Sequence, residues 1–295
     1  MSKSRPMTSR QRLTTAGILA GVICTGPAFG PAFRAQGAPH ERASIPNFSQ
    51  TSRVGWLKTG NGDEFLAPAS GPGPIVADPG HPYVPNGGGR QETSKIADLS
   101  NPILKPWAAE MMKKANDEVL AGKVGFTARS RCWPHGVPGF LLYPVHPIFF
   151  VQTSKEVLMT WGEDFQTRRI YLDQKHSAHP KPSWYGESVG HYENGDTLVV
   201  DTIGMNDKTY VDNFRTPHTT QLHVMERFRI VDAGKTLEVN VHVEDPGAFT
   251  MAWNAVQRYR RVEDGPLAEI VCAENNTDHF NQGLAPIPEA SAPDF

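Results

Sequence analysis

The stretch from residue 215 to residue 229, RTPHTTQLHVMERFR, brings together two histidines, one glutamate and three arginines. His218, His223 and Glu226 are of the types that bind metal ions or transfer protons. His218 and His223 are five residues apart, whereas two metal ligands on one helical face are four apart. If the stretch is a strand, His223 and Glu226 point to opposite faces, because side chains alternate along a strand. The spacing therefore disfavours a metal site here.

A second histidine pair, His176 and His179 in the sequence HSAH, lies in a proline-rich region. It could supply two ligands, but no third ligand is obvious, and tetrahedral sites need more ligands than this at short spacing. We therefore predict no metal site in the chain.

Strand alternation places Glu226 on an apolar face. Leu222, Val224 and Phe228 would share its side of the strand. The next segment, TLEVNVHVE at 236–244, has a matching face of one leucine and three valines, which leaves His242 on the opposite face as a surface residue. A lone carboxylate on such a face must find a partner, raise its pKa or border a cavity, because burying it unpaired costs several kcal/mol, roughly 2–7 even for an uncharged polar group.

Glu226 is accordingly the first candidate for a general acid or base. The following strand would add aromatic and hydrogen-bonding side chains beside it, which is the usual composition of a small-molecule pocket. The structural alternative is a buried ion pair, with Arg227 and Arg258 as the nearest arginines in sequence. The predicted catalytic residues are Glu226, His223, His218, Asp201 and Tyr259; the predicted ligand-binding residues are Trp253, Gln257, Phe228, Asp207, Lys208 and Tyr210.

Other reaction classes are disfavoured. No Gly-x-Ser-x-Gly elbow is present, since Ser188 in YGESVG follows Glu187 and does not lie between the right glycines. The formal net charge of -2, without a basic cluster, argues against nucleic acid as a partner. We predict no cofactor, and the sequence leaves the oligomeric state open.

The N-terminus is typical of an export signal. Basic residues precede the apolar core LTTAGILAGVICTGPAFG, and small residues follow it. This run is too short and too rich in Gly and Thr for a membrane span. We predict that residues 1–38 are an export signal and processing region, that the protein is periplasmic or secreted, and that it does not insert stably into a membrane.

Export would leave two cysteines, Cys132 and Cys272. Two cysteines in an oxidising compartment most simply pair, so we predict a disulfide between them. The alternative is two separate buried thiols. A loop of this length would gain roughly 4–5 kcal/mol from the cross-link on the chain-entropy model.

The rest of the chain divides by its pattern. Residues 39–103 are dense in Pro and Gly without a period, which predicts an irregular wrap. The segment 104–121 predicts a helix whose stripe of Trp107, Met111, Ala115 and Val119 packs on the main body. Residues 281–295 are expected to form a flexible tail.

Short apolar segments follow one another between residues 137 and 274. They are GFLLYPV, PIFFVQTS, EVLMTW, RRIYLD, ESVGHYE, TLVVDTIG, QLHVMERFRIVD, TLEVNVHVED, FTMAWNAVQRYRRV and PLAEIVCAE. NGD between two of them is a hairpin signal. Strands in series with short links predict a mainly β domain at 104–280: an antiparallel up-and-down barrel or a strongly bent sheet, with one N-terminal helix.

The words RRIYLD, SWYGESVGHYENGDTLVVDTIGMNDKTYVD, PHTTQLHVMERFR, VEDP and CAENN resemble a widespread group of exported bacterial β-rich proteins to which no reaction is assigned. The likeness covers about residues 104–277 and implies an exported β-rich domain. The strand pattern is also similar to the lipocalin-like (calycin) architecture, which serves many functions.

These observations together lead to one functional expectation. The chain would be an exported barrel whose interior pocket takes a small apolar or aromatic molecule, acting as a cofactor-independent acid/base enzyme: a lyase, isomerase or hydrolase. The alternative is a non-catalytic periplasmic binding or carrier protein.

Overall fold

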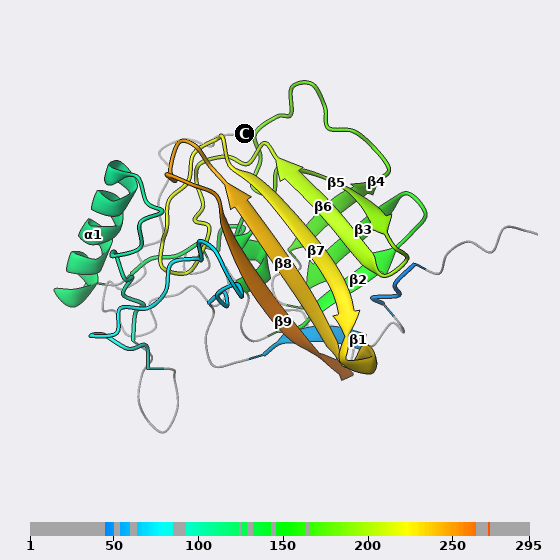
Figure 1. Ribbon diagram of the computed structural model, residues 1–295, viewed down its shortest axis with the longest axis horizontal. Helices are drawn as coiled ribbons and strands as arrows, with labels where there is room; N and C mark the ends of the chain where they lie inside the picture. The colour runs from blue at the N-terminus through cyan, green and yellow to red at the C-terminus, as the bar shows by residue number, and fades with distance from the viewer. Residues whose placement is uncertain are drawn as a thin grey trace, which may run out of the picture. The chain divides into compact units, whose positions relative to one another are not determined.

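The computed structural model describes residues 45–49, 54–59, 64–84, 93–123, 125–128, 132–142, 146–162, 166–263 and 271. Nine strands form a closed barrel in chain order, with β1 paired to both β2 and β9 (Figure 1). The strands are β1 Val54–Lys58, β2 Ile148–Gln152, β3 Glu156–Trp161, β4 Thr167–Leu172, β5 Glu187–Glu193, β6 Thr197–Ile203, β7 His223–Val231, β8 Thr236–Glu244 and β9 Trp253–Glu263. The predicted mainly β barrel is confirmed.

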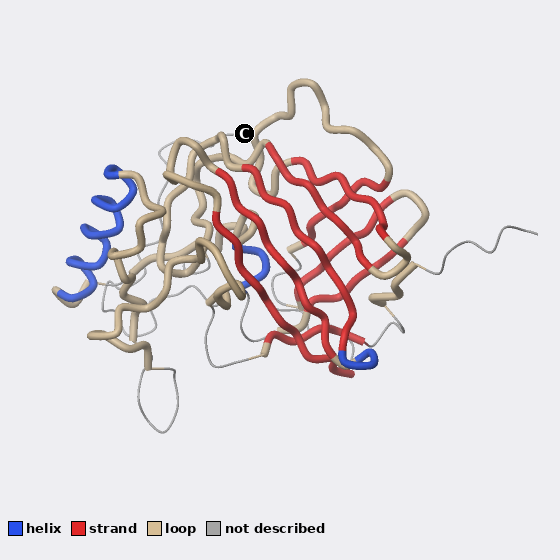
Figure 2. The backbone as a smooth tube through the Cα atoms, in the orientation of Figure 1, coloured by secondary structure: helices blue, strands red, loops and turns tan. Residues whose placement is uncertain are grey.

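Helical structure is scarce among the described residues, as Figure 2 shows by colour. It consists of the helix α1 (Pro106–Leu120) and two short 3₁₀ segments, η2 (Gly139–Leu142) and η3 (Asp232–Gly234). None of the described helices is long and apolar enough to cross a membrane. The predicted export signal, the C-terminal tail and the predicted strand PLAEIVCAE lie outside the described residues, apart from Val271 in the last of these.

The hairpin between β5 and β6 forms where NGD predicted it. Asn194 and Gly195 both have positive φ, 53° and 73°, as a type I′ turn requires. Glu193 and Thr197 pair across the turn. The alternation predicted for the next strands is also confirmed, since Glu226 lies opposite Val241 and both are buried.

One strand pair differs from an up-and-down barrel. β4 and β5 run parallel, and Ile170 lies opposite Ser188. Parallel neighbours need a long crossover connection, and residues 173–186 provide it. Figure 1 shows this connection as the long loop that projects beyond the ends of the strands. The Pro-rich sequence HSAHPKPSW in this connection marks the crossover, which the assumption of short links missed.

Two segments have a different structure from the one their patterns predicted. The wrap contributes β1, which closes the barrel by pairing five residues with β9. GFLL, the described part of the segment GFLLYPV, forms η2 and not a strand, and all four of its residues are buried. Trp161 donates from Nε1 to the Phe140 carbonyl at 2.9 Å, and Tyr259 donates from its hydroxyl to the Leu141 carbonyl at 2.6 Å. The strands β3 and β9 are therefore hydrogen-bonded to η2. This segment was predicted to be a strand of the barrel, but η2 fills the space instead.

The helix α1 forms as predicted, but the predicted packing stripe is wrong by one position. The buried residues are Ala108, Met112 and Asn116, whereas Trp107 is 39% and Met111 51% exposed. Asn116 decides this orientation, because its side chain accepts from the Ala97 N–H at 3.1 Å and donates to the Ala97 carbonyl at 2.9 Å. A pattern of apolar residues alone does not reveal a buried asparagine that binds a neighbouring backbone.

Candidate functional site

Glu226 lies in a buried ion pair inside the barrel. Arg168 of β4 reaches it with two nitrogens, Nη1 to Oε1 at 2.8 Å and Nη2 to Oε2 at 2.5 Å, and both side chains are 0% exposed. Arg168 also donates to Thr202 Oγ1 at 2.8 Å and to Ser188 Oγ at 3.2 Å. Glu226 therefore forms the buried ion pair that was the structural alternative to a catalytic role. The bidentate contact, together with the two hydroxyl partners of Arg168, links four strands.

The partner of Glu226 was predicted wrongly. Arg227 and Arg258 point outward, where they pair with Glu193 and Glu238. Strand alternation in TRRIYL places Arg168 on the same buried face as Ile170 and Leu172, and this signal in the sequence could have identified it.

The other predicted interior residues take part in packing. Burial raises the pKa of Tyr259 well above its ordinary value, and its hydroxyl is bound to the η2 backbone. Trp253 packs against Phe249, with ring centroids 5.9 Å apart. Phe228 packs against Phe150 at 6.2 Å. Gln257 donates to the Glu64 carbonyl at 3.4 Å. The structure thus brings Glu226, Tyr259, Trp253, Gln257 and Phe228 together in the barrel interior, all of them 0–1% exposed.

A further group of predicted residues lies in the connection between β6 and β7. His218 is buried, which lowers its pKa, and its Nδ1 lies 3.0 Å from the Thr219 carbonyl. A carbonyl only accepts, so Nδ1 carries the proton and Nε2 accepts from Thr209 Oγ1 at 2.9 Å. Both nitrogens of this neutral histidine are engaged in holding the connection. Asp207 and Lys208 are exposed in the same connection, and Tyr210 pairs with Pro217 in an isolated bridge.

Asp201 and His223, also predicted, meet on the outer face of the barrel. Their contact is 2.9 Å from Asp201 Oδ1 to His223 Nε2. The same carboxylate oxygen lies 3.2 Å from Nε2 of His176, which comes from the crossover connection. Two imidazoles from distant parts of the sequence therefore converge on one oxygen atom.

The other nitrogen of each imidazole faces a second carboxylate. His176 Nδ1 lies 3.1 Å from Glu187 Oε1, and His223 Nδ1 lies 3.5 Å from Glu244 Oε2. Glu244 in turn contacts His242 at 3.0 Å. We call this set the imidazole–carboxylate row; in spatial order it is Glu187, His176, Asp201, His223, Glu244, His242 and Asn254.

Strand register builds the row from neighbouring outward positions. His223 lies opposite Glu244, and His242 lies opposite Asn254. His242 Nδ1 is 2.8 Å from Asn254 Oδ1. Adjacent strands carry side chains directly opposite one another on the same face, so the row crosses β5 to β9. Only His176 comes from outside the strands.

The row alternates acceptors with imidazoles. Nδ1 of His176 and both nitrogens of His223 lie within hydrogen-bond distance of carboxylate oxygens. Hydrogen bonds from Ser177 and His176 lower the pKa of Glu187, against desolvation. Hydrogen bonds from His242 and His223 lower that of Glu244. Glu187 and Glu244 are thereby held in the charged form beside the imidazoles of the row.

Desolvation acts to lower the pKa of His242, but its hydrogen bonds with Glu244 and Asn254 outweigh this effect, and the pKa is raised. Partial exposure leaves the row within reach of solvent: His223 is 31% and Asp201 37% exposed. Groups of this kind can donate and accept protons near neutral pH.

Most of the row was not predicted from the sequence. His242 was interpreted only as a surface residue, and His176 only as half of a metal site without a third ligand. In the part of the chain that the structure describes, no group of three or more His, Cys, Asp or Glu side chains is arranged to hold a metal ion. The signal that was present is positional: Asp201, His223, Glu244 and His242 all occupy outward positions on consecutive strands.

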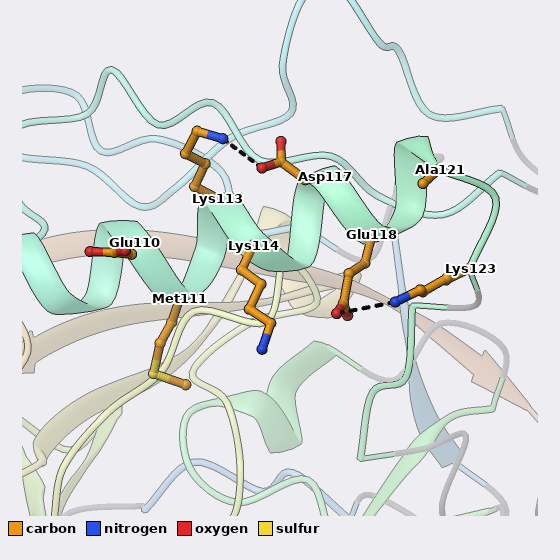
Figure 3. Close-up of a pocket in the computed structure, with 8 residues that line it drawn as sticks. All are labelled: Glu110, Met111, Lys113, Lys114, Asp117, Glu118, Ala121 and Lys123. Carbon is orange, nitrogen blue, oxygen red and sulfur yellow. Dashed lines mark hydrogen bonds and ion pairs between the residues drawn. The ribbon is translucent and has the colours of Figure 1, made fainter.

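A surface groove of about 730 Å³ adjoins the row. It lies over the outer face of β7, β8 and β9, where His242 and Asn254 line it, and residues 66–70 form its side. A second hollow lies along α1 (Figure 3), where Lys113 pairs with Asp117 and Lys123 with Glu118. Its charged residues neutralise one another in solvent, as on an ordinary helix surface, so the groove beside the row is the better candidate for a ligand.

No model of a known protein family matches this chain, and a comparison with curated proteins finds no match either. The function must therefore be argued from the site. Cys272 lies outside the described residues, so the Cys132–Cys272 disulfide stays a prediction.

Proposed function

We propose that this barrel protein is exported and performs acid/base chemistry on a small organic molecule at the imidazole–carboxylate row. The observation that carries the proposal is the shared oxygen: Asp201 Oδ1 lies 2.9 Å from Nε2 of His223 and 3.2 Å from Nε2 of His176. In its neutral form one imidazole can take a proton from a substrate, and the shared carboxylate stabilises the imidazolium that results. The other imidazole, in its protonated form, can return a proton to the product. This chemistry suits a lyase, an isomerase or a hydrolase that needs no cofactor.

The proposal moves the site from the interior to the outside of the barrel. Among the interior residues predicted for catalysis, the carboxylate of Glu226 is bound by Arg168, and the hydroxyl of Tyr259 donates to the Leu141 carbonyl. A general base must come within hydrogen-bond reach of the proton that it removes. His223 and Asp201 of the row suit this role better than the interior residues, since their side chains are 31% and 37% exposed.

Solvent deuterium exchange tests the proposal without a known substrate. The protein would be incubated in deuterium oxide with a panel of carboxylic acids and ketones that carry an acidic C–H bond, and proton NMR would follow the loss of that signal. We expect at least one compound to exchange faster than in buffer, and His223→Gln or Asp201→Asn to reduce the added rate by about 10²-fold, the lower range for general acid–base groups.

The matched control is Arg229→Gln, because Arg229 lies on the outer face of β7 and pairs with Asp196 outside the row. This variant should exchange at the wild-type rate. Enzyme-dependent exchange that the His223 and Asp201 variants leave unchanged would refute the assignment of the row.

The alternative function is non-catalytic binding of a small molecule, and the groove beside the row favours it. Binding of a panel compound without enhanced exchange in any compound would support this carrier function over the enzyme.

A further inference from the structure

The groove on β7 to β9 has a fixed apolar wall. Leu66 pairs with Val256 through two backbone hydrogen bonds of 2.9 and 3.0 Å, and the Asn254 N–H donates to the Pro72 carbonyl at 3.0 Å. The Leu66 side chain is nevertheless 50% exposed. Hydrogen bonds hold the backbone of this wall in place, while its apolar side chain stays in solvent. The wall therefore offers a preformed contact surface for an apolar group.

The floor of the groove presents hydrogen-bond donors. Arg258 uses Nε and Nη2 on Glu238 Oε2, at 2.8 and 2.5 Å, which leaves Nη1 without a partner among the described residues. Arg227 uses only Nη2, on Glu193. Its Nε and Nη1 have no other partner in that part of the chain. Each guanidinium is oriented by its carboxylate and keeps donors for another acceptor.

Asn240 lies on β8, between the strands that carry the two arginines. It is opposite Arg227 on β7 and opposite Val256 on β9, and it lines the groove. Its exposed side chain makes no hydrogen bond with a described residue. The middle of the groove therefore holds an unused amide, flanked by two guanidiniums and bordered by an apolar wall.

We infer that this groove binds a small organic carboxylate with an apolar body, whose carboxylate meets Arg227, Asn240 and Arg258 and whose body lies against Leu66. The inference rests on the proposed function, because it names the class of molecule that the same outer face would handle. The volume of about 730 Å³ is within the range of small-molecule sites. His242 lines the same groove and belongs to the row, so a bound carboxylate would lie next to the proton-transfer groups.

Fluorine NMR with 4-fluorobenzoate tests the inference, with neutral 4-fluorobenzamide as the matched probe. We expect the benzoate to bind at least about tenfold more tightly than the amide, because charge-assisted hydrogen bonds to guanidinium are about twice as strong as neutral ones. Asn240→Leu and Arg227→Gln should each weaken benzoate binding by about tenfold or more, the lower end of the range for one hydrogen bond to a charged group. Arg229→Gln, outside the groove lining, should leave it within twofold.

Equal binding of the two probes, or benzoate binding that Asn240→Leu and Arg227→Gln leave unchanged, would overturn the inference. The row variant His176→Gln separates it from the proposed function, because His176 does not line the groove. Benzoate binding that survives in His176→Gln while deuterium exchange is lost supports both proposals. Exchange that depends on the row, without benzoate binding, refutes the groove assignment alone.

Discussion

The buried ion pair between Arg168 and Glu226 gives the sharpest prediction about this fold. Both side chains are 0% exposed and are joined by two hydrogen bonds. Glu226→Gln keeps the shape of the side chain but removes the counter-charge of the buried guanidinium, which then faces only neutral oxygens: the new amide oxygen and the hydroxyls of Ser188 and Thr202. Removing one partner of a buried pair costs about 3–5 kcal/mol, because the remaining charge stays buried without a counter-charge.

Urea unfolding followed by tryptophan fluorescence and circular dichroism would measure this loss. For a domain of about 200 residues the same change corresponds to a fall in melting temperature of roughly 6–20 °C. Replacing both partners, Arg168→Met with Glu226→Leu, should cost much less than the sum of the single changes, since no charge is left unpaired. Glu238→Gln on the outer face is the control, where loss of the pair with Arg258 should change stability by less than about 1 kcal/mol.

Two outcomes would refute this reasoning. If Glu226→Gln folds with unchanged stability, the ion pair does not stabilise the barrel. If it is stable and also loses deuterium exchange, Glu226 takes the catalytic role that its sequence position first suggested. A loss of stability in both single variants that the double variant largely recovers would establish that the ion pair stabilises the barrel.

Three further predictions concern other sites. Burial raises the pKa of Asp212 to about 6, although hydrogen bonds from Thr216 and Phe214 act to lower it. Because the folded pKa lies above the unfolded one, stability is lost as pH rises through about 6. In urea unfolding, Asp212→Asn should therefore be more stable than the wild type by up to about 3 kcal/mol at pH 8 and equal to it near pH 4. The raised pKa of His242 predicts that its NMR titration midpoint falls in Glu244→Gln, and a midpoint that does not move would show that Glu244 has no such effect. Peptide mapping under non-reducing conditions should recover Cys132 linked to Cys272, whereas recovery of two alkylated thiols would contradict the disulfide.

Alternation predicted the faces of the last strands well, because it is a local property. Glu226 was placed inside, and His223 and His242 outside, from the residues of single strands. The identity of a partner is not local in the same way. Arg168 is 58 residues from Glu226 in sequence, and the two meet only because the barrel wraps the faces of β4 and β7 around one interior.

The same limit explains why the row was missed. Asp201 and His223 were both candidates, but their contact depends on the pairing register of β6 and β7. The position of His176 depends on the crossover connection, which the chain needs because β4 and β5 are parallel. The error at α1 has another cause: a buried asparagine shifted the buried face by one position from the one that the apolar pattern predicted.

The energetics of the row favour a functional origin over a structural one. Exposed ion pairs contribute about 0–1 kcal/mol each, so the contacts of His223 and His242 stabilise the barrel little. Arg227–Glu193 and Arg258–Glu238 show that this surface already pairs its charges with arginines, which stay charged at all physiological pH values. The row has histidines beside its carboxylates. Their charge depends on pH, which that of arginines in the same positions would not. Ion pairing at the surface gains nothing from histidine in place of arginine, whereas proton transfer requires a group that changes its charge. The exchange experiment with His223→Gln distinguishes these two roles.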